Sequence, residues 1–209
     1  MTEAIFKGIG LGLILAVSVG PVIFTILKQS INNGQQGGFS FVGGVWVSDI
    51  IWVIISNLFS SLVAELLHYK VTIGIIGAAF VFCLGIFYVF FKRVQVDANN
   101  LVVIDFGRKD FTKAFMSGFI INTLNPSVIF FWLINATAFG TSHTLSERIV
   151  LFGVCLGVNI LADILKVMMA AKIRHRLTPH NVSIINKISG SILIIFAISI
   201  AYGILFLNK

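Results

Sequence analysis

The chain has 209 residues, of which 57% are hydrophobic and only 11% are charged, and its mean hydropathy is +1.01. Soluble domains are roughly half apolar and about one-quarter charged, so this composition excludes a soluble globular protein and indicates an integral membrane protein. The net charge of +7 is spread over short segments between apolar runs, which argues against a nucleic-acid-binding surface.

Six apolar segments follow one another, each close to the roughly 20 residues that an α-helix needs to cross a bilayer. They are predicted at residues 4–27, 39–64, 72–91, 113–139, 148–171 and 185–207. Their apolar residues do not alternate with polar ones, which favours helices over a barrel. The first is longer than the apolar core of a signal peptide and follows the acidic Glu3, so we expect it to be retained. We therefore predict an all-α integral membrane protein with six transmembrane helices in a single domain, residues 1–209.

The first segment contains Ser-Val-Gly-Pro at residues 18–21, near the middle of its apolar run. Proline removes a backbone N–H and disrupts the preceding helical turn, and inside a bilayer no water replaces the lost hydrogen bond. The freed backbone groups must then face a neighbouring helix or a wet cavity. The sequence predicts an interrupted helix here, although a simple packing kink is the alternative.

The second segment carries Asp49 about ten residues after its predicted start. An ionised carboxylate at the centre of a membrane costs about 2.5–3.5 kcal/mol on the insertion scale, so Asp49 is expected to face the protein interior. Burial favours the neutral carboxyl group, which suits a residue that loads and releases protons. The alternative is a neutral or salt-bridged aspartate that only ties helices together.

The fourth segment contains Asn-Thr-Leu-Asn-Pro at residues 122–126, a second predicted break. The start of a broken helix exposes N–H groups that suit a carboxylate, and the end of the preceding half exposes carbonyls that suit an ammonium group. A zwitterion matches both. The predicted substrate-binding residues are Ser18, Gly20, Pro21, Asn122, Asn125 and Pro126.

The fifth segment holds a second acidic residue, Asp163, with Lys166 three residues later and Asn159 four residues earlier. These positions form one polar stripe on a helix. Two interpretations are open: Lys166 pairs with Asp163 and keeps it charged, or Lys166 extends toward the membrane surface and leaves Asp163 free to exchange protons. Asp49 and Asp163 are the two predicted proton-coupling residues.

The two halves of the chain, about residues 1–100 and 101–209, resemble each other weakly. Pro21 and Pro126 are 105 residues apart, and Asp49 and Asp163 are 114 residues apart. Because each half has three predicted spans, the second half enters the membrane from the opposite side. The sequence thus predicts two inverted three-helix repeats, a common plan of secondary transporters, with chance similarity between apolar helices as the alternative.

Lysine and arginine residues predict the orientation of the chain. Ten lie in or beside the connections 1–2, 3–4 and 5–6, and four lie on the other side. The positive-inside rule therefore places these connections in the cytoplasm and both termini outside.

The motifs together resemble the lysine exporter (LysE) translocator family, which includes the arginine and threonine/homoserine exporter branches. They are Gly-x-Gly-Leu followed by Ser-Val-Gly-Pro near residues 10–21, Val-Ser-Asp at 47–49 and Asn-Thr-Leu-Asn-Pro at 122–126. The resemblance extends over essentially the whole chain and implies efflux of amino acids or close derivatives across the bacterial inner membrane, driven by proton exchange. Members often have Pro-Gly-Pro where this chain has Val19-Gly20-Pro21. Some exporters of basic amino acids have an acidic residue soon after the Asn-Pro pair, whereas this chain reads Ser-Val-Ile-Phe-Phe at 127–131, which argues against a cationic substrate.

The leading hypothesis is a proton-coupled amino-acid exporter that needs no cofactor and is not an enzyme, since no catalytic constellation converges. A metal-ion or other inorganic-ion exporter is the alternative, although no metal-binding set is predicted. A thiol-electron carrier would need a redox cysteine pair, and Cys83 and Cys155 fall at different points of their halves. The expected partners are a small-molecule substrate, protons and the lipid bilayer, and a homo-oligomer is left open.

Overall fold

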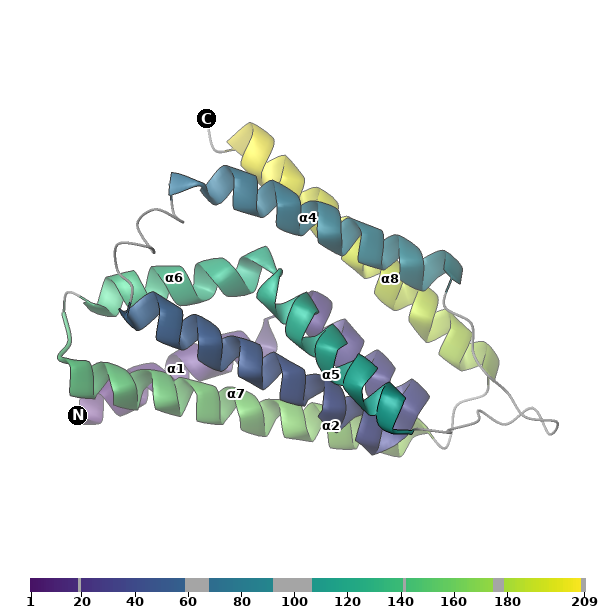
Figure 1. The fold of residues 1–209 in the computed structure, drawn as a ribbon, viewed down its shortest axis with the longest axis horizontal. Coiled ribbons are helices and arrows are strands. Elements are labelled where there is room, and N and C mark those ends of the chain that lie inside the picture. The colour runs from purple at the N-terminus through teal and green to yellow at the C-terminus, as the bar shows by residue number, and fades with distance from the viewer. Residues whose placement is uncertain (19, 59–67, 92–106, 141, 175–178, 208–209) are drawn as a thin grey trace.

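The computed structural model describes residues 1–18, 20–58, 68–91, 107–140, 142–174 and 179–207. Within these ranges the regular structure is helical and contains no strand. The elements are α1 (Thr2–Val17), α2 (Pro21–Leu58), α4 (Lys70–Ile86), the π-helix η1 (Phe87–Phe91), α5 (Arg108–Thr123), α6 (Pro126–Gly140), α7 (Leu145–Arg174), α8 (Pro179–Tyr202) and the π-helix η2 (Gly203–Leu207). Figure 1 shows their arrangement.

Four of the described helical segments are long and apolar enough to cross a membrane: α2, α4 with η1, α7, and α8 with η2. A fifth is added if α5 and α6, which are bent by 58° at residues 124–125, form one span. The prediction of an all-helical membrane protein is therefore confirmed. The predicted second segment, 39–64, falls within α2 as far as residue 58, and its last six residues lie outside the described part of the chain.

Helix α2 reverses direction at Gly34, whose φ of 66° and ψ of −165° interrupt the helix. Only glycine adopts this region without strain. We call residues 21–33 the first arm of α2 and residues 35–58 the second arm. Ile26 and Phe41 pack in one buried cluster, whereas a straight helix would place them about 22 Å apart. The second arm therefore returns beside the first arm, and Figure 1 shows that the first arm continues the path of α1.

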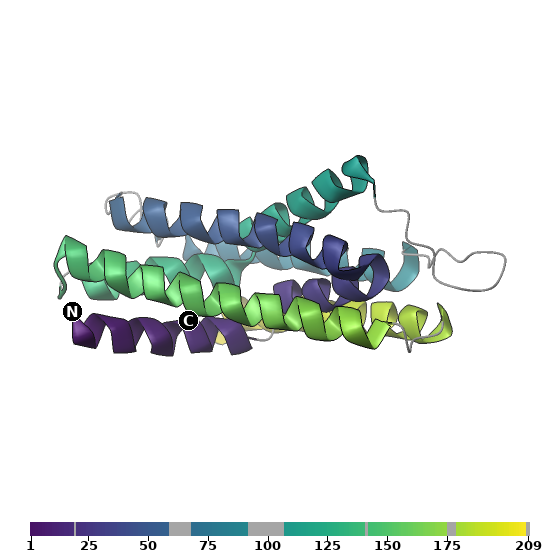
Figure 2. The same cartoon turned by 90° about the horizontal axis from the view of Figure 1, so that it is seen from below.

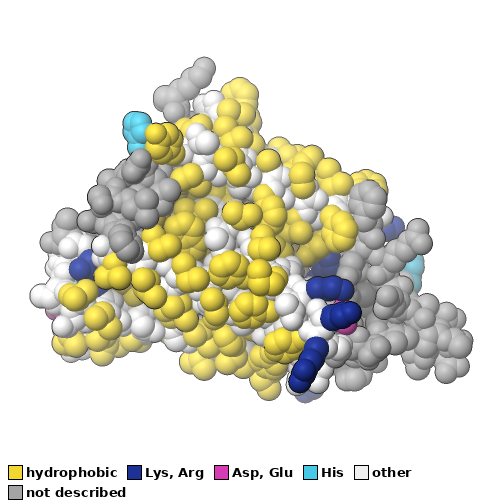
Figure 3. All heavy atoms as spheres, viewed as in Figure 1, with side chains coloured by type: hydrophobic (Ala, Val, Ile, Leu, Met, Phe, Trp, Pro, Cys, Tyr) yellow, Lys and Arg dark blue, Asp and Glu magenta, His cyan; other side chains and the backbone are white. Residues whose placement is uncertain are grey.

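The remaining helices pack as pairs around this hairpin. Helix α1 lies along α7, α5 lies along α2, and α4 lies along α8; Figures 1 and 2 both place α1 beside α7. In Figure 1 the path from α1 into the first arm and the path from α5 into α6 run in opposite directions, as do the second arm and α7. On the face drawn in Figure 3, a group of lysine and arginine side chains lies near the start of α5, and another basic side chain lies at the opposite end of the molecule.

Glycines allow the helix pairs to approach at backbone distance. Gly118 of α5 faces the backbone of Phe41, and Gly44 of α2 faces the backbone of Phe115. On the other pair, Gly12 of α1 faces the carbonyl of Cys155. Small residues at helix contacts of this kind are common in membranes, because they let the backbones come close.

We expect Gly118→Ala to lower the free energy of unfolding by about 1–3 kcal/mol, since the added methyl group overlaps the Phe41 carbonyl. Gly157→Ala is the matched control, because a methyl group there meets no atom within 4 Å. The control should be as stable as the original protein or slightly more stable. Thermal unfolding in detergent, followed by size-exclusion chromatography, measures both; equal stability of the two variants would contradict the packing described here.

Candidate functional site

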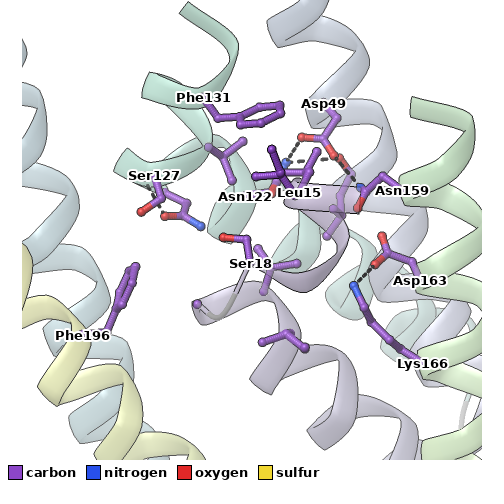
Figure 4. Close-up of a pocket in the computed structure, with 17 residues that line it drawn as sticks. Leu15, Ser18, Asp49, Asn122, Ser127, Phe131, Asn159, Asp163, Lys166 and Phe196 are labelled. Atoms are coloured by element: carbon purple, nitrogen blue, oxygen red, sulfur yellow. Dashed lines mark hydrogen bonds and ion pairs between the residues drawn. The ribbon is translucent and has the colours of Figure 1, made fainter. Parts of the chain in front are cut away.

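The two predicted helix breaks are present and open onto one cavity. Helix α1 ends at Val17 and α2 begins at Pro21, while α5 ends at Thr123 and α6 begins at Pro126. The cavity has a volume of about 80 Å³ and is lined by residues of α1, α2, α5, α6, α7 and α8 (Figure 4). Six of the eight sequence-predicted site residues line it: Ser18, Gly20, Asp49, Asn122, Asn125 and Asp163. Pro21 and Pro126, the other two, are buried at the first positions of α2 and α6.

Local hydrogen bonds shape the second break. Asn125 accepts a hydrogen bond from the Ser127 N–H at its side-chain oxygen (3.1 Å), and its carbonyl accepts the Val128 and Ile129 N–H groups (both 3.0 Å). This is the role of an N-cap residue, which satisfies the first N–H groups of a helix. Asn125 thus fixes the start of α6 at the cavity wall.

The first break has a simpler arrangement. The Ser18 N–H donates to the Leu15 carbonyl (3.2 Å) and closes the last turn of α1. Thr25 donates its hydroxyl to the Pro21 carbonyl (2.8 Å), one turn into α2. Because proline has no N–H and stands at the first helical position, α2 can begin here without losing an internal hydrogen bond.

Asp49 lies on the second arm of α2, with only 2% of its surface exposed. Its Oδ1 accepts hydrogen bonds from Asn122 Nδ2 of α5 (2.8 Å) and Trp132 Nε1 of α6 (3.0 Å). Its Oδ2 accepts a longer one from Asn159 Nδ2 of α7 (3.5 Å). Three helices therefore meet at one carboxylate, and all three donors are neutral. Among the described residues Asp49 forms no ion pair.

Asp163 has a different environment on α7. Its Oδ1 pairs with Lys166 Nζ at 2.8 Å, and its Oδ2 accepts a hydrogen bond from Trp46 Nε1 of α2 at 3.2 Å. The exposed side-chain fractions are 2% for Asp163 and 19% for Lys166. Of the two interpretations of the sequence, the structure contains the Asp163–Lys166 pair.

The two aspartates are held in a reciprocal way. Trp46, three residues before Asp49, donates to Asp163, and Asn159, four residues before Asp163, donates to Asp49. Each helix thus supplies a donor to the carboxylate of the other. Two hydrogen bonds, both accepted by carboxylate oxygens, therefore join α7 to the second arm of α2 at this level.

The rest of the wall is largely apolar. In Figure 4 the Phe131 ring lies beside Asp49, and Phe196 of α8 faces the region of Ser18 and Ser127. The other apolar lining residues are Ile14, Leu15, Val22, Ile23, Val45 and Val128. A few polar groups in an apolar cavity are typical of sites that bind and orient a small molecule.

Sequence reasoning missed the role of Trp132. It is fully buried, six residues after Pro126, and its ring also packs against Phe152 of α7. A buried indole N–H needs an acceptor, so a tryptophan inside an apolar helix could have indicated that a hydrogen-bond acceptor lies nearby in the protein interior. Only the register between α6 and α2 identifies Asp49 as that acceptor. Asn159 was recognised as part of a polar stripe, but not as a partner of Asp49.

No metal centre is formed by the described residues: nowhere do three or more His, Cys, Asp or Glu side chains converge. Cys83 is exposed and Cys155 is buried, and both are free thiols. The polar groups of the cavity are thus two carboxylates, one ammonium, and amide and hydroxyl groups.

A family model for the LysE type translocator matches residues 13–203, which is most of the chain. The protein belongs to the LysE type translocator family. Neither the curated proteins nor the solved structures contain a match to the chain. The family resemblance predicted from the sequence is thereby confirmed. Members of this family are transporters, and the apolar helices agree with a multi-pass membrane protein that carries a small molecule. In this LysE-type translocator, the match includes both helix breaks and both aspartates.

Proposed function

We propose that this LysE-type translocator exports amino acids or close derivatives across the bacterial inner membrane in exchange for protons. The observation that carries the proposal is the position of Asp49. This buried carboxylate has only neutral hydrogen-bond donors, and it lies on a cavity where two broken helices meet. A carboxyl group in such a place can alternate between charged and neutral forms as access to it changes.

The architecture would be two inverted three-helix repeats. The first comprises α1 with the first arm, the second arm, and α4; the second comprises α5 with α6, then α7, then α8. Their opposite directions in Figure 1 support this division. Two close glycine contacts also support this division. Gly12 of α1 approaches the Cys155 carbonyl of α7, and Gly118 of α5 approaches the Phe41 carbonyl of α2 in the same way. Phe41 and Cys155 are 114 residues apart, the same spacing that separates Asp49 from Asp163.

The two breaks would bind the charged groups of the substrate. The first turns of α2 and α6 present the positive ends of helix dipoles, which favour a carboxylate. The last carbonyls of α1 and α5 favour an ammonium group. Ser18, Gly20, Asn122 and Asn125 line the cavity at these ends, and Pro21 and Pro126 define them.

The two carboxylates would have unequal roles. Asp49 would carry the proton, because its partners donate hydrogen bonds but bring no positive charge. Asp163 would assist by keeping Lys166 at the cavity wall and by anchoring Trp46. A fixed ion pair and a single exchangeable carboxyl group favour one proton for each transported molecule.

The orientation follows from the positive-inside rule. The Gly34 turn and the start of α5, near which basic side chains gather in Figure 3, would face the cytoplasm. Both termini would then lie outside. Protons entering from the outer face would drive substrate outward.

A transport assay in liposomes tests the function. Purified protein is reconstituted, and each of a panel of radiolabelled amino acids is supplied outside vesicles whose lumen is acidic. Antiport moves protons out of the lumen and label in, so we expect at least one amino acid to accumulate above its outside concentration. A protonophore should abolish the accumulation, and protein-free vesicles are the control. If no amino acid accumulates in acidic vesicles, the proposed function is wrong.

A further inference from the structure

The two oxygens of the Asp49 carboxylate are not equivalent. Oδ1 accepts two hydrogen bonds, at 2.8 Å and 3.0 Å, from Asn122 and Trp132. Oδ2 accepts one, at 3.5 Å, from Asn159. A proton added to the carboxylate would displace a donor from the oxygen that it joins. Oδ2, with one long hydrogen bond, therefore loses least on protonation.

The partners of Oδ1 are committed to donation. An indole N–H can only donate, so Trp132 requires an acceptor in either protonation state. The Asn122 amide also donates from the same nitrogen to the Val45 carbonyl at 3.3 Å, which holds that nitrogen toward α2. Both residues are thus suited to an oxygen that remains an acceptor throughout.

Asn159 differs from Trp132 in that its amide contains both a donor and an acceptor, and from Asn122 in that no second hydrogen bond holds its nitrogen in the described structure. Within the described part of the chain, its only side-chain hydrogen bond is the one to Asp49. The terminal torsion of asparagine is broad and roughly two-fold, so half a turn places Oδ1 of Asn159 where Nδ2 was. It would then accept the proton of a carboxylic acid at Oδ2.

We propose that Asn159 is a positioning residue that responds to the protonation state of Asp49, donating to the carboxylate and accepting from the carboxylic acid. The inference rests on the proposed role of Asp49 as the proton carrier. An O–H···O hydrogen bond measures about 2.5–3.0 Å, so the 3.5 Å separation would shorten when Asp49 takes up a proton. Protonation would draw α7 toward the second arm of α2.

The consequence extends along α7. Asn159, Asp163 and Lys166 lie on one stripe of that helix, so a shift at Asn159 also moves the ion pair at the cavity wall. The other titratable or charged groups near Asp49 in the described structure are Cys155 and Asp163, with Lys166 paired to the latter. Of the described groups that bind Asp49 directly, Asn159 is the one on α7, and its amide lacks the second hydrogen bond that holds the Asn122 nitrogen toward α2.

Infrared difference spectroscopy of the full protein in liposomes, recorded across a pH titration, tests this without a known substrate. The C=O stretching band of protonated Asp49 is assigned as the band that Asp49→Asn removes. In Asn159→Leu we expect this band to move to higher frequency, because the acid O–H has lost its acceptor. Asn159→Ser, whose hydroxyl can donate and accept, should give an intermediate position.

Asn135→Leu is the matched control, since Asn135 of α6 bonds only the Phe131 carbonyl of its own helix among the described residues. It should leave the band unchanged. If Asn159→Leu does not fold, Asn159→Ala removes the same amide without adding bulk and should give the same upward shift. An unchanged band in the Leu or Ala variant would overturn the role of Asn159 alone. If Asp49→Asn removes no band at any pH, Asp49 does not exchange protons, and the coupling assignment in the proposed function fails with it.

Discussion

Asp49→Asn is expected to reduce the accumulation of amino acid driven by a pH gradient to the level of protein-free liposomes. The substitution preserves the shape of the side chain but removes the group that binds the proton. Its amide oxygen can still accept from Asn122 and Trp132, so the free energy of unfolding should change by only about 1 kcal/mol. Transport in acidic vesicles and thermal unfolding in detergent measure the two effects separately.

The control for this substitution is Asp110→Asn. Asp110 lies in the first turn of α5, outside the cavity, and its partly exposed side chain pairs with Lys113 at 3.7 Å. The control should transport normally. Normal gradient-driven accumulation by Asp49→Asn would show that another group carries the proton, and the unequal roles assigned to the two aspartates would be wrong.

Lys166→Met is expected to lower the free energy of unfolding by about 3–5 kcal/mol, because it leaves the carboxylate of Asp163 buried without a cation. Methionine keeps the approximate length of the side chain, so lost packing contributes little. Adding Asp163→Asn should restore most of the stability, since no uncompensated charge remains. Chemical unfolding of the original protein, both single variants and the double variant gives the interaction energy between Asp163 and Lys166 in a double-mutant cycle.

Lys113→Met provides the comparison for this cycle. Lys113 also pairs with an aspartate three residues away on its own helix, but its side chain is 77% exposed. Exposed pairs contribute about 0–1 kcal/mol, so this variant should be almost as stable as the original protein. If Lys166→Met and the double variant unfold alike, Asp163 is not held as an ion pair.

The features that could be predicted from the sequence depend on residue types that a membrane helix tolerates poorly. Proline inside an apolar run predicted both breaks, and the breaks occur within a few residues of Pro21 and Pro126. An aspartate in such a run predicted a buried polar site, and Asp49 and Asp163 both line the cavity. These inferences need only the properties of the bilayer, because lipid penalises a free carbonyl or a charge wherever it lies.

The features that escaped prediction depend on how helices pack. Trp132 and Asn159 are 83 and 110 residues from Asp49 in the chain, and only the register of α6 and α7 against α2 brings them together. The choice between a paired and a free Lys166 depends on which way a flexible side chain turns, which composition does not determine. The tight reversal at Gly34 was likewise hidden, since the surrounding glutamines, asparagines and glycines gave only a connection between two spans.

The bend between α5 and α6 affects how the protein enters the membrane during synthesis. At 1.5 Å per residue, the 16 residues of α5 and the 15 of α6 are about 24 Å and 22 Å long, and each falls short of a hydrocarbon layer of about 30 Å. The first turns of α5 are also charged, so its apolar part is shorter still. Neither helix alone is long enough to span the hydrocarbon layer, whereas the two together pass as one bent span. We therefore expect α5 and α6 to enter the membrane together, as one paired segment, after the ribosome has completed much of α6.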